Sequence, residues 1–398
     1  YTFTFFNQEF DDLGLFSTVG NGYAGFNDLS ITLDSQDNFG AAVSIALSNL
    51  VVGAPFDDGF CNSLTNSGAV YLLLHGPFAG AGGIIGTIGS GYTGLNSLNL
   101  TSLDPGDQFG ASVSVDAVAQ QLAVGAPRDE GAGNIGGSAS SIGAVYTFTF
   151  ADSQASLVAQ AGIIGRGYTG TNDSDPGSLD DNDRFGSGVS LHGGLLAIGA
   201  PGDQGAGNAL PLGAGAVYLY GFSSSLLATP LQRLIIGNGY VGTTNGVSNI
   251  PVALEQGDSF GASVSLSGST VGGLGLAVGA PFDDGPGNTQ AEGGGVHFFL
   301  FDDTAFNGGR LVGAIGAGYR STTALDLTAP IPTTLAQVGG GDSFGSALSL
   351  NGNRLAIGAP NDDGSIDGLT DAGAVFLFTF ADAIFGGATL QSVIGHGY

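Results

Sequence analysis

The stretch Phe260 to Pro281 decides the fold and reads FGASVSLSGSTVGGLGLAVGAP. Apolar and small polar residues alternate along it with a period of two, which is typical of β-strands joined by a turn. The Phe-Gly pair recurs through the chain, and each copy is followed 14 to 19 residues later by Gly-Ala-Pro. The five pairs are Phe39-Gly40, Phe109-Gly110, Phe185-Gly186, Phe260-Gly261 and Phe344-Gly345. Their spacings of 70, 76, 75 and 84 residues indicate one supersecondary unit per copy.

Two more apolar segments follow each Gly-Ala-Pro, or GAP, motif. After a Gly-rich acidic loop comes a run such as GAVYLYGF (215–222), and then a shorter one such as LIIGNGY (234–240). We therefore predict four strands per repeat and an all-β chain of tandem four-stranded antiparallel blades, either a β-propeller or a propeller-like repeat array. Because one such sheet cannot bury both of its faces, neighbouring blades are expected to pack face to face.

The Phe-Gly pairs also set the expected boundaries within one propeller-like domain. The opening YTFTF (1–5) matches residues 146–150, so we expect the chain to start inside a repeat. The expected segments are 1–38 for the end of a preceding repeat and a connector, then repeats at 39–108, 109–184, 185–259, 260–343 and 344–398. Extra residues before each Phe-Gly pair, such as 93–108, are expected to decorate an edge or a face of the blade.

These motifs carry a resemblance to a known family. The pattern D-x-F-G-x-S-V-x-L, then L-A-V-G-A-P, an acidic loop and G-A-V-Y-x-F resembles the FG-GAP repeat and spans nearly the whole chain. That family includes the β-propeller heads of integrin alpha subunits and large bacterial surface proteins. In its closed, integrin-like form it implies seven blades, whereas this chain supplies five and the last two strands of another. The resemblance implies an extracellular, cell-surface or adhesive role.

Composition excludes several classes of partner. The 398 residues carry 34 acidic side chains against 7 basic ones, all Arg, for a formal net charge of -27. Nucleic acid and anionic membrane surfaces are therefore excluded as partners, because both attract Lys and Arg. The sequence contains no run of about 20 apolar residues, so membrane insertion is not predicted. Cys61 is the single cysteine, so the chain has no disulfide framework of its own.

Acidic residues recur at two positions of each repeat. One set lies two residues before each Phe-Gly pair: Asp37, Asp107, Asp183, Asp258 and Asp342. The other follows GAP, and from it we predict candidate Ca²⁺ ligands: Asp57, Asp58, Asp129, Glu130, Asp203, Asp283, Asp284, Asp362 and Asp363. Clustered carboxylates suit Ca²⁺, a hard ion that takes six to eight oxygen ligands.

A purely structural interpretation explains the same residues. Asp-Gly pairs make turns in which the carboxylate accepts a backbone hydrogen bond and Gly takes a positive φ. The D-x-D-x-D-G loop of integrin-type repeats is also missing between the Phe-Gly and GAP strands, where Asn351-Gly352-Asn353 is typical of a hairpin turn. Both interpretations of the loops stay open at this point.

Two other recurrent motifs are assigned to structure. Four segments, such as Gly237 to Gly242, match G-x-G-x-x-G, but no helix is predicted after them, so no nucleotide cofactor is expected. The tyrosine of this motif recurs in every repeat, and we expect it to pack in the core or an interface. These residues are Tyr23, Tyr92, Tyr168, Tyr240, Tyr319 and Tyr398.

The sequence favours a protein that is not an enzyme. The four histidines fall at different places in their repeats, so no catalytic triad can be assembled. The leading expectation is an extracellular structural or adhesive surface protein, part of a larger polypeptide or filament, that binds itself or other surface or matrix components and has Ca²⁺-stabilised loops. One alternative is the ligand-binding propeller head of an adhesion protein, in which one repeat would diverge. Another is a non-catalytic propeller attached to an enzyme.

Overall fold

In the computed structural model, the described residues form five β-sheets of four or five strands and three two-stranded ones. The structure describes residues 2–5, 13–23, 28–74, 83–137, 140–210, 213–268, 273–288, 291–316, 318–319, 324–326, 338–364, 369–382 and 384–398. These residues contain no helix, so no described segment could cross a membrane as one. The chain divides into two compact units, Tyr1–Gly194 with Phe222–Pro230, and Leu195–Gly221 with Leu231–Tyr398.

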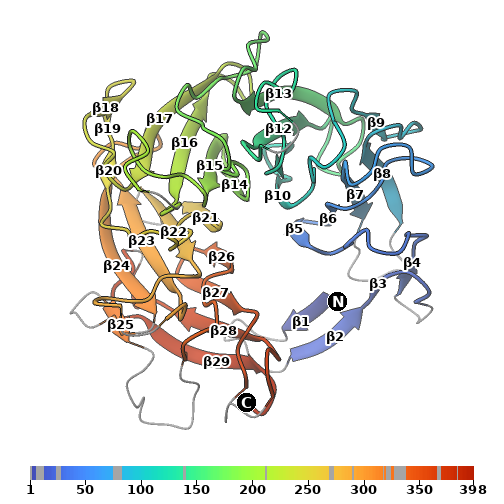
Figure 1. Cartoon of the computed structure of the whole chain (residues 1–398). Coiled ribbons are helices and arrows are strands. Elements are labelled where there is room, and N and C mark those ends of the chain that lie inside the picture. The colour runs from blue at the N-terminus through green and yellow to red at the C-terminus, as the bar shows by residue number, and fades with distance from the viewer. Residues whose placement is uncertain are drawn as a thin grey trace. The chain divides into compact units, whose positions relative to one another are not determined.

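The first unit holds two complete sheets whose long strands lie side by side in chain order (Figure 1). The first sheet contains β5 (Ala42–Ala46), β6 (Asn49–Ala54), β7 (Ala69–Leu74), β8 (Ile84–Gly89) and β9 (Leu98–Asn99). The second contains β10 (Ser112–Asp116), β11 (Gln121–Ala126), β12 (Ala144–Thr149) and β13 (Ala159–Gly165). This unit also contains β14 (Gly188–His192), which lies beside β10.

Before the first sheet lie four short strands. They are β1 (Thr2–Phe5), β2 (Leu13–Ser17), β3 (Val19–Gly20) and β4 (Leu29–Ser30). β1 and β2 pair antiparallel, as the third and fourth strands of the second repeat do.

The second unit repeats the same plan. The strands that it contributes to its first sheet are β15 (Leu195–Ala200), β16 (Ala216–Phe222), β17 (Pro230–Gly237) and β20 (Ile250–Pro251). A small separate hairpin is formed by β18 (Thr243–Thr244) and β19 (Val247–Ser248). The next sheet contains β21 (Ser263–Gly268), β22 (Leu274–Ala280), β23 (Gly295–Phe301), β24 (Arg310–Gly316) and β25 (Ala324–Asp326). The last contains β26 (Ala347–Asn351), β27 (Arg354–Ala359), β28 (Ala374–Thr379) and β29 (Thr389–Gly395).

The prediction of an all-β chain of tandem four-stranded antiparallel blades is confirmed. The Phe-Gly pair precedes the first strand, and the GAP motif ends the second. The turn predicted at Asn351-Gly352-Asn353 is a two-residue hairpin, since Asn351 pairs with Arg354. The segments before the Phe-Gly pairs contribute a feature that the four-strand prediction did not include. This feature is a short parallel strand on the free edge of the fourth strand, as in β8–β9 and β24–β25. Such an addition covers an edge that would otherwise expose unpaired backbone groups.

The hydrophobic core lies between neighbouring sheets. One cluster combines Val70 and Leu72 of β7 with Val113 of β10 and Phe148 of β12. Another combines Phe298 of β23 with Phe376 of β28. The Phe of the Phe-Gly pair contacts two neighbouring blades. Phe109, for example, is fully buried and packs edge-on against Tyr146 of its own blade. Its backbone N–H donates to the carbonyl of Ser67 in the preceding blade.

Glycine is required where two blades touch through their backbones. The Phe-Gly glycine of each following blade lies against the GAP glycine of the blade before it, and a β-carbon on the GAP glycine would overlap the neighbour's carbonyl oxygen. The described contacts of this kind are Gly53 with Gly110, Gly125 with Gly186, Gly199 with Gly261 and Gly279 with Gly345. Only glycine allows such an approach of two backbones.

We expect Gly199→Ala to lower the free energy of unfolding by about 1–3 kcal/mol, because the added methyl group forces the Gly261 backbone away. Gly358→Ala is the matched control. A β-carbon at Gly358 meets nothing closer than the Ala347 side chain at 3.3 Å, so its effect should stay within about 0.5 kcal/mol. Calorimetry or urea denaturation of both variants measures the difference, and equal effects would contradict the assignment.

Candidate functional site

The first acidic residue after each GAP motif is buried. The second strand of each blade ends at the Ala of this motif, and the chain then turns away from the sheet, as after β6 and β11. The exposed fractions are 3% for Asp57, 1% for Asp129, 2% for Asp203, 7% for Asp283 and 1% for Asp362. A buried carboxylate is costly unless hydrogen bonds satisfy it, so its partners decide its role.

One partner is the turn itself. In every repeat the Oδ1 atom of this aspartate accepts a hydrogen bond from the backbone N–H of the glycine two residues later, at 2.7 to 2.9 Å. The glycine is in the left-handed region where the structure forms this turn, for example at Gly59 with φ 73°. This is the Asp-Gly turn of the structural interpretation.

Two tyrosine hydroxyls complete the shell around the carboxylate. The tyrosine of the Gly-x-Gly-Tyr motif donates to it in every repeat, as Tyr168 does to Oδ2 of Asp129 at 2.9 Å. In the first three repeats a tyrosine of the third strand donates as well: Tyr71 to Asp57, Tyr146 to Asp129 and Tyr218 to Asp203, at 2.7 to 2.9 Å. In these three repeats the carboxylate therefore joins its own turn, the third strand and the end of the fourth strand.

The last two repeats vary the third-strand partner. The fourth has His297, whose Nε2 lies 3.2 Å from Oδ2 of Asp283. The fifth has Phe376, which has no polar atom at this position. Since Tyr, His and Phe are all aromatic, the position keeps its packing when the hydrogen bond changes or is lost.

Electrostatics keeps the tyrosines protonated. Burial, followed by the nearby aspartate charge, raises the pKa of Tyr71, Tyr168 and Tyr319 above the ordinary value for tyrosine. Burial acts to raise the pKa of Asp283, but the hydrogen bond and charge of His297, with Tyr319, hold that pKa below its usual range. The hydroxyls therefore remain donors near neutral pH.

The second acidic residue closes the loop that follows. Asp58 accepts the backbone N–H of Asn66, Asp284 that of Glu292 and Asp363 that of Asp371, each eight residues further along the chain. The second repeat differs, because Glu130 is 8% exposed and its Oε2 atom has no hydrogen-bond partner.

The acidic residues before the Phe-Gly pairs also hold loops. All five are buried, and each accepts the backbone N–H of the residue three positions earlier at 2.6 to 2.7 Å. Burial, with the charge of Asp129, raises the pKa of Asp107 to about 8. In this repeat the two sets of carboxylates therefore oppose each other's ionisation.

Part of the chain matches a known family of repeats. The family model described as FG-GAP repeat matches residues 33–73, 163–220 and 336–378. These three segments carry FG-GAP repeats. Among solved structures it is similar to the crystal structure of the Saccharomyces cerevisiae Sqt1, with 12% identity, a TM-score of 0.35, and coverage of 91% of this chain and 86% of that one. A comparison with curated proteins gives no match.

The first aspartates of the post-GAP loops already have hydrogen-bond donors around them, and the calcium prediction remains a prediction. The oxygens of the first aspartates face N–H and O–H donors, and no three His, Cys, Asp or Glu side chains of the described residues gather as a metal site. Calcium requires six to eight oxygen ligands. Among the predicted ligands, Glu130 is the one with a buried oxygen that has no hydrogen-bond partner in the part of the chain described.

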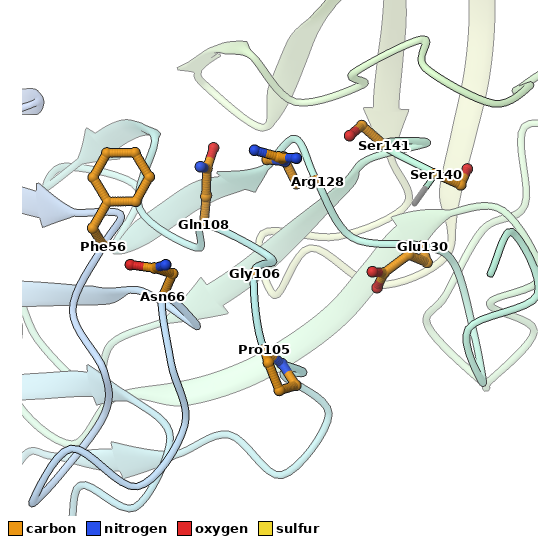
Figure 2. Close-up of a pocket in the computed structure, with 9 residues that line it drawn as sticks. All are labelled: Phe56, Asn66, Pro105, Gly106, Gln108, Arg128, Glu130, Ser140 and Ser141. Carbon is orange, nitrogen blue, oxygen red and sulfur yellow. The ribbon is translucent and has the colours of Figure 1, made fainter. Parts of the chain in front are cut away.

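A polar pocket of about 270 Å³ opens at this glutamate of the second repeat. Figure 2 shows Gln108, Arg128 and Glu130 around it, with Phe56 and Asn66 of the first repeat on the other side. Ser140, Ser141, Pro105 and Gly106 complete the lining. The other four repeats place Phe56, Gly202, Phe282 and Asn361 where this one places Arg128. Arg128 is therefore specific to the second repeat, and the other repeats have no basic side chain at the matching position.

The tyrosine pair was not predicted from the sequence as a partner of the aspartate. The Gly-x-Gly-Tyr tyrosine was expected only to pack, and the tyrosine of the GAVY segment had no predicted role. The signal available was their recurrence: the two tyrosines follow the buried aspartate by 14 to 17 and by 35 to 39 residues in each repeat that has them.

We expect Tyr146→Phe to lower the free energy of unfolding by about 1–3 kcal/mol, because it removes a donor from a buried carboxylate. Phe376→Tyr is the converse variant and should not destabilise, since it adds a hydroxyl that other repeats already contain. Scanning calorimetry measures both. An unchanged transition in Tyr146→Phe would contradict a stabilising role for this hydrogen bond.

The calcium prediction has a direct test in the melting temperature of the metal-free protein as Ca²⁺ is added. With the carboxylates already bonded to tyrosine and glycine, we expect a shift within the error of the measurement. A rise that saturates with Ca²⁺ would instead assign ligands to these loops, and Glu130→Gln would show whether the second repeat supplies them.

Proposed function

We propose that this chain is a non-catalytic structural protein of the cell exterior, a rigid FG-GAP repeat body within a larger surface assembly or filament. The observation that carries this proposal is the use of the recurrent polar groups. In every repeat the buried aspartate accepts hydrogen bonds from its glycine and from its tyrosine, so these groups serve the repeat itself.

Composition supports a place outside the cell. The chain has no Lys and no Met, so proteases that cut at basic residues find only 7 Arg, and no methionine can be oxidised. A net charge of -27 favours solubility. The partners we propose are other copies of this chain or other surface and matrix components.

The histidine arrangement supports a protein that is not an enzyme. His297 lies against Asp283 and Tyr319, a contact that would suggest a catalytic dyad in isolation. It occupies the position that tyrosine holds in the first three repeats, and it is only 6% exposed. Packing therefore explains this histidine.

A second candidate function is a ligand-binding propeller head, and the pocket of the second repeat favours it. Arg128, Glu130 and Gln108 would offer a small polar ligand both charges and an amide. The divergence of one repeat is what this alternative requires. A third role, as a non-catalytic propeller beside an enzyme, has no specific observation in its favour.

Immunogold labelling of intact producing cells tests the proposal. We expect label on the outer surface that proteinase K removes, and label seen only after permeabilisation would overturn it. Cells that express Arg128→Ala provide the second arm. A structural role leaves their surface layer and their attachment unchanged, whereas a binding head loses attachment with the layer intact.

A further inference from the structure

The pocket at Glu130 contains two opposite charges that do not pair with each other. Arg128 and Glu130 both line it, and no ion pair among the described residues includes either of them. Burial raises the pKa of the Glu130 carboxyl, as do the charges of Asp129 and Asp104, whereas the Arg128 charge acts to lower it. The two groups are thus near enough to interact, and a ligand that carries both charges can pair with both side chains.

The surroundings of this pocket also contain buried polar atoms that lack a hydrogen-bond partner in the part of the chain described. They are Oε2 of Glu130, Oδ1 of Asp107 and Oγ of Ser67, in residues that are 8%, 1% and 0% exposed. Asp107 and Ser67 are each adjacent in sequence to a lining residue, Gln108 and Asn66. Buried polar groups in proteins are normally satisfied, so a ligand that donates hydrogen bonds to Glu130 is favoured here.

These features are specific to the second repeat. At the position of Glu130 the other repeats have Asp58, Gln204, Asp284 and Asp363. The three aspartates close their own loops, whereas Glu130 has a longer side chain with a free oxygen. In Figure 2 its carboxylate points toward the Pro105-Gly106 turn. All the lining residues belong to the first compact unit, so the pocket is formed within that unit alone.

Charge and size select the class of ligand. The chain has a formal charge of -27, so it repels a simple anion on its way to Arg128, while a simple cation at Glu130 meets the Arg128 charge nearby. A ligand with one carboxylate and one ammonium has no net charge and satisfies both side chains. A guanidinium binds a carboxylate in a bidentate way. The volume of about 270 Å³ lies just below the usual range of small-molecule sites, which suits a ligand of few atoms.

We propose that this pocket binds a free α-amino acid, with its carboxylate on Arg128 and its ammonium on Oε2 of Glu130. The amides of Gln108 and Asn66 line the same pocket and favour a polar side chain on the ligand. This inference rests on the second candidate function, the ligand-binding propeller head, and deepens it by naming the class of ligand.

Isothermal titration calorimetry of the full chain with L-serine and with L-glutamine tests the proposal. We expect saturable binding of one ligand per chain. N-Acetylserine lacks the ammonium and serinamide lacks the carboxylate. Each should bind at least about tenfold more weakly than serine, because each loses one charge-assisted contact.

Two variants test the assignment of the contacts. Glu130→Gln keeps the shape of the side chain and removes its charge, and Arg128→Ala removes a guanidinium from an exposed position. Each should weaken amino-acid binding at least about tenfold. Arg310→Ala is the matched control, since it removes an exposed arginine of the second unit, and it should bind as the wild type does. Melting curves of the ligand-free variants show that each one folds.

The opposite results are distinct. The absence of binding heat with both amino acids would overturn the proposal and favour a direct pairing of Arg128 with Glu130. Equal affinity for serine and N-acetylserine would reject the zwitterion, and binding unchanged in both pocket variants would place the amino acid elsewhere. Loss of attachment in Arg128→Ala cells, without amino-acid binding by the purified chain, would keep the binding head and reject this class of ligand. Surface labelling is independent of all these titrations.

Discussion

The close approach of two glycine backbones at each blade junction is the constraint on which the rest of the structure depends. A sheet buries its second face only against another sheet, and here the distance is set where a Phe-Gly backbone lies on a GAP glycine, as Gly261 does on Gly199. That approach lets Phe260 donate its N–H to Ala214 of the preceding blade while its ring is buried in its own. The Phe-Gly motif is thus the fixed contact between two neighbouring blades, and it occurs once in each repeat.

The aspartate network solves a second problem that the sheets create. Each blade ends its second strand in a long loop, and a loop has no ladder of its own to fix it. A buried carboxylate with a glycine amide on one side and tyrosine hydroxyls on the other ties that loop to two strands at once. The fourth and fifth repeats, with His297 and Phe376, show that the aspartate and the Gly-x-Gly-Tyr tyrosine are the constant part of this arrangement.

Period and strand pattern were predictable from the sequence because both depend on residues close together in the chain. The alternation in Phe260 to Pro281 gives β21 and β22 directly, and the turn at Gly352-Asn353 follows from its residues. The short parallel strand at the sheet edge was not predictable, since two residues such as Leu98–Asn99 carry no pattern. Nor was the role of Asp129, whose tyrosine partners lie 17 and 39 residues away and could be placed only by the register of three strands.

Many of the acidic residues that give this chain its negative formal charge are not at its surface. Ten of its 34 acidic residues are the two recurrent sets, five before the Phe-Gly pairs and five after GAP, and all ten are buried. A formal count treats them as surface charge available to cations, yet they accept backbone and tyrosine hydrogen bonds inside each blade. The acidic composition therefore overstates the charge that these loops present at the surface. In this fold it reflects how many loops must be held, because each additional repeat brings two more buried carboxylates with it.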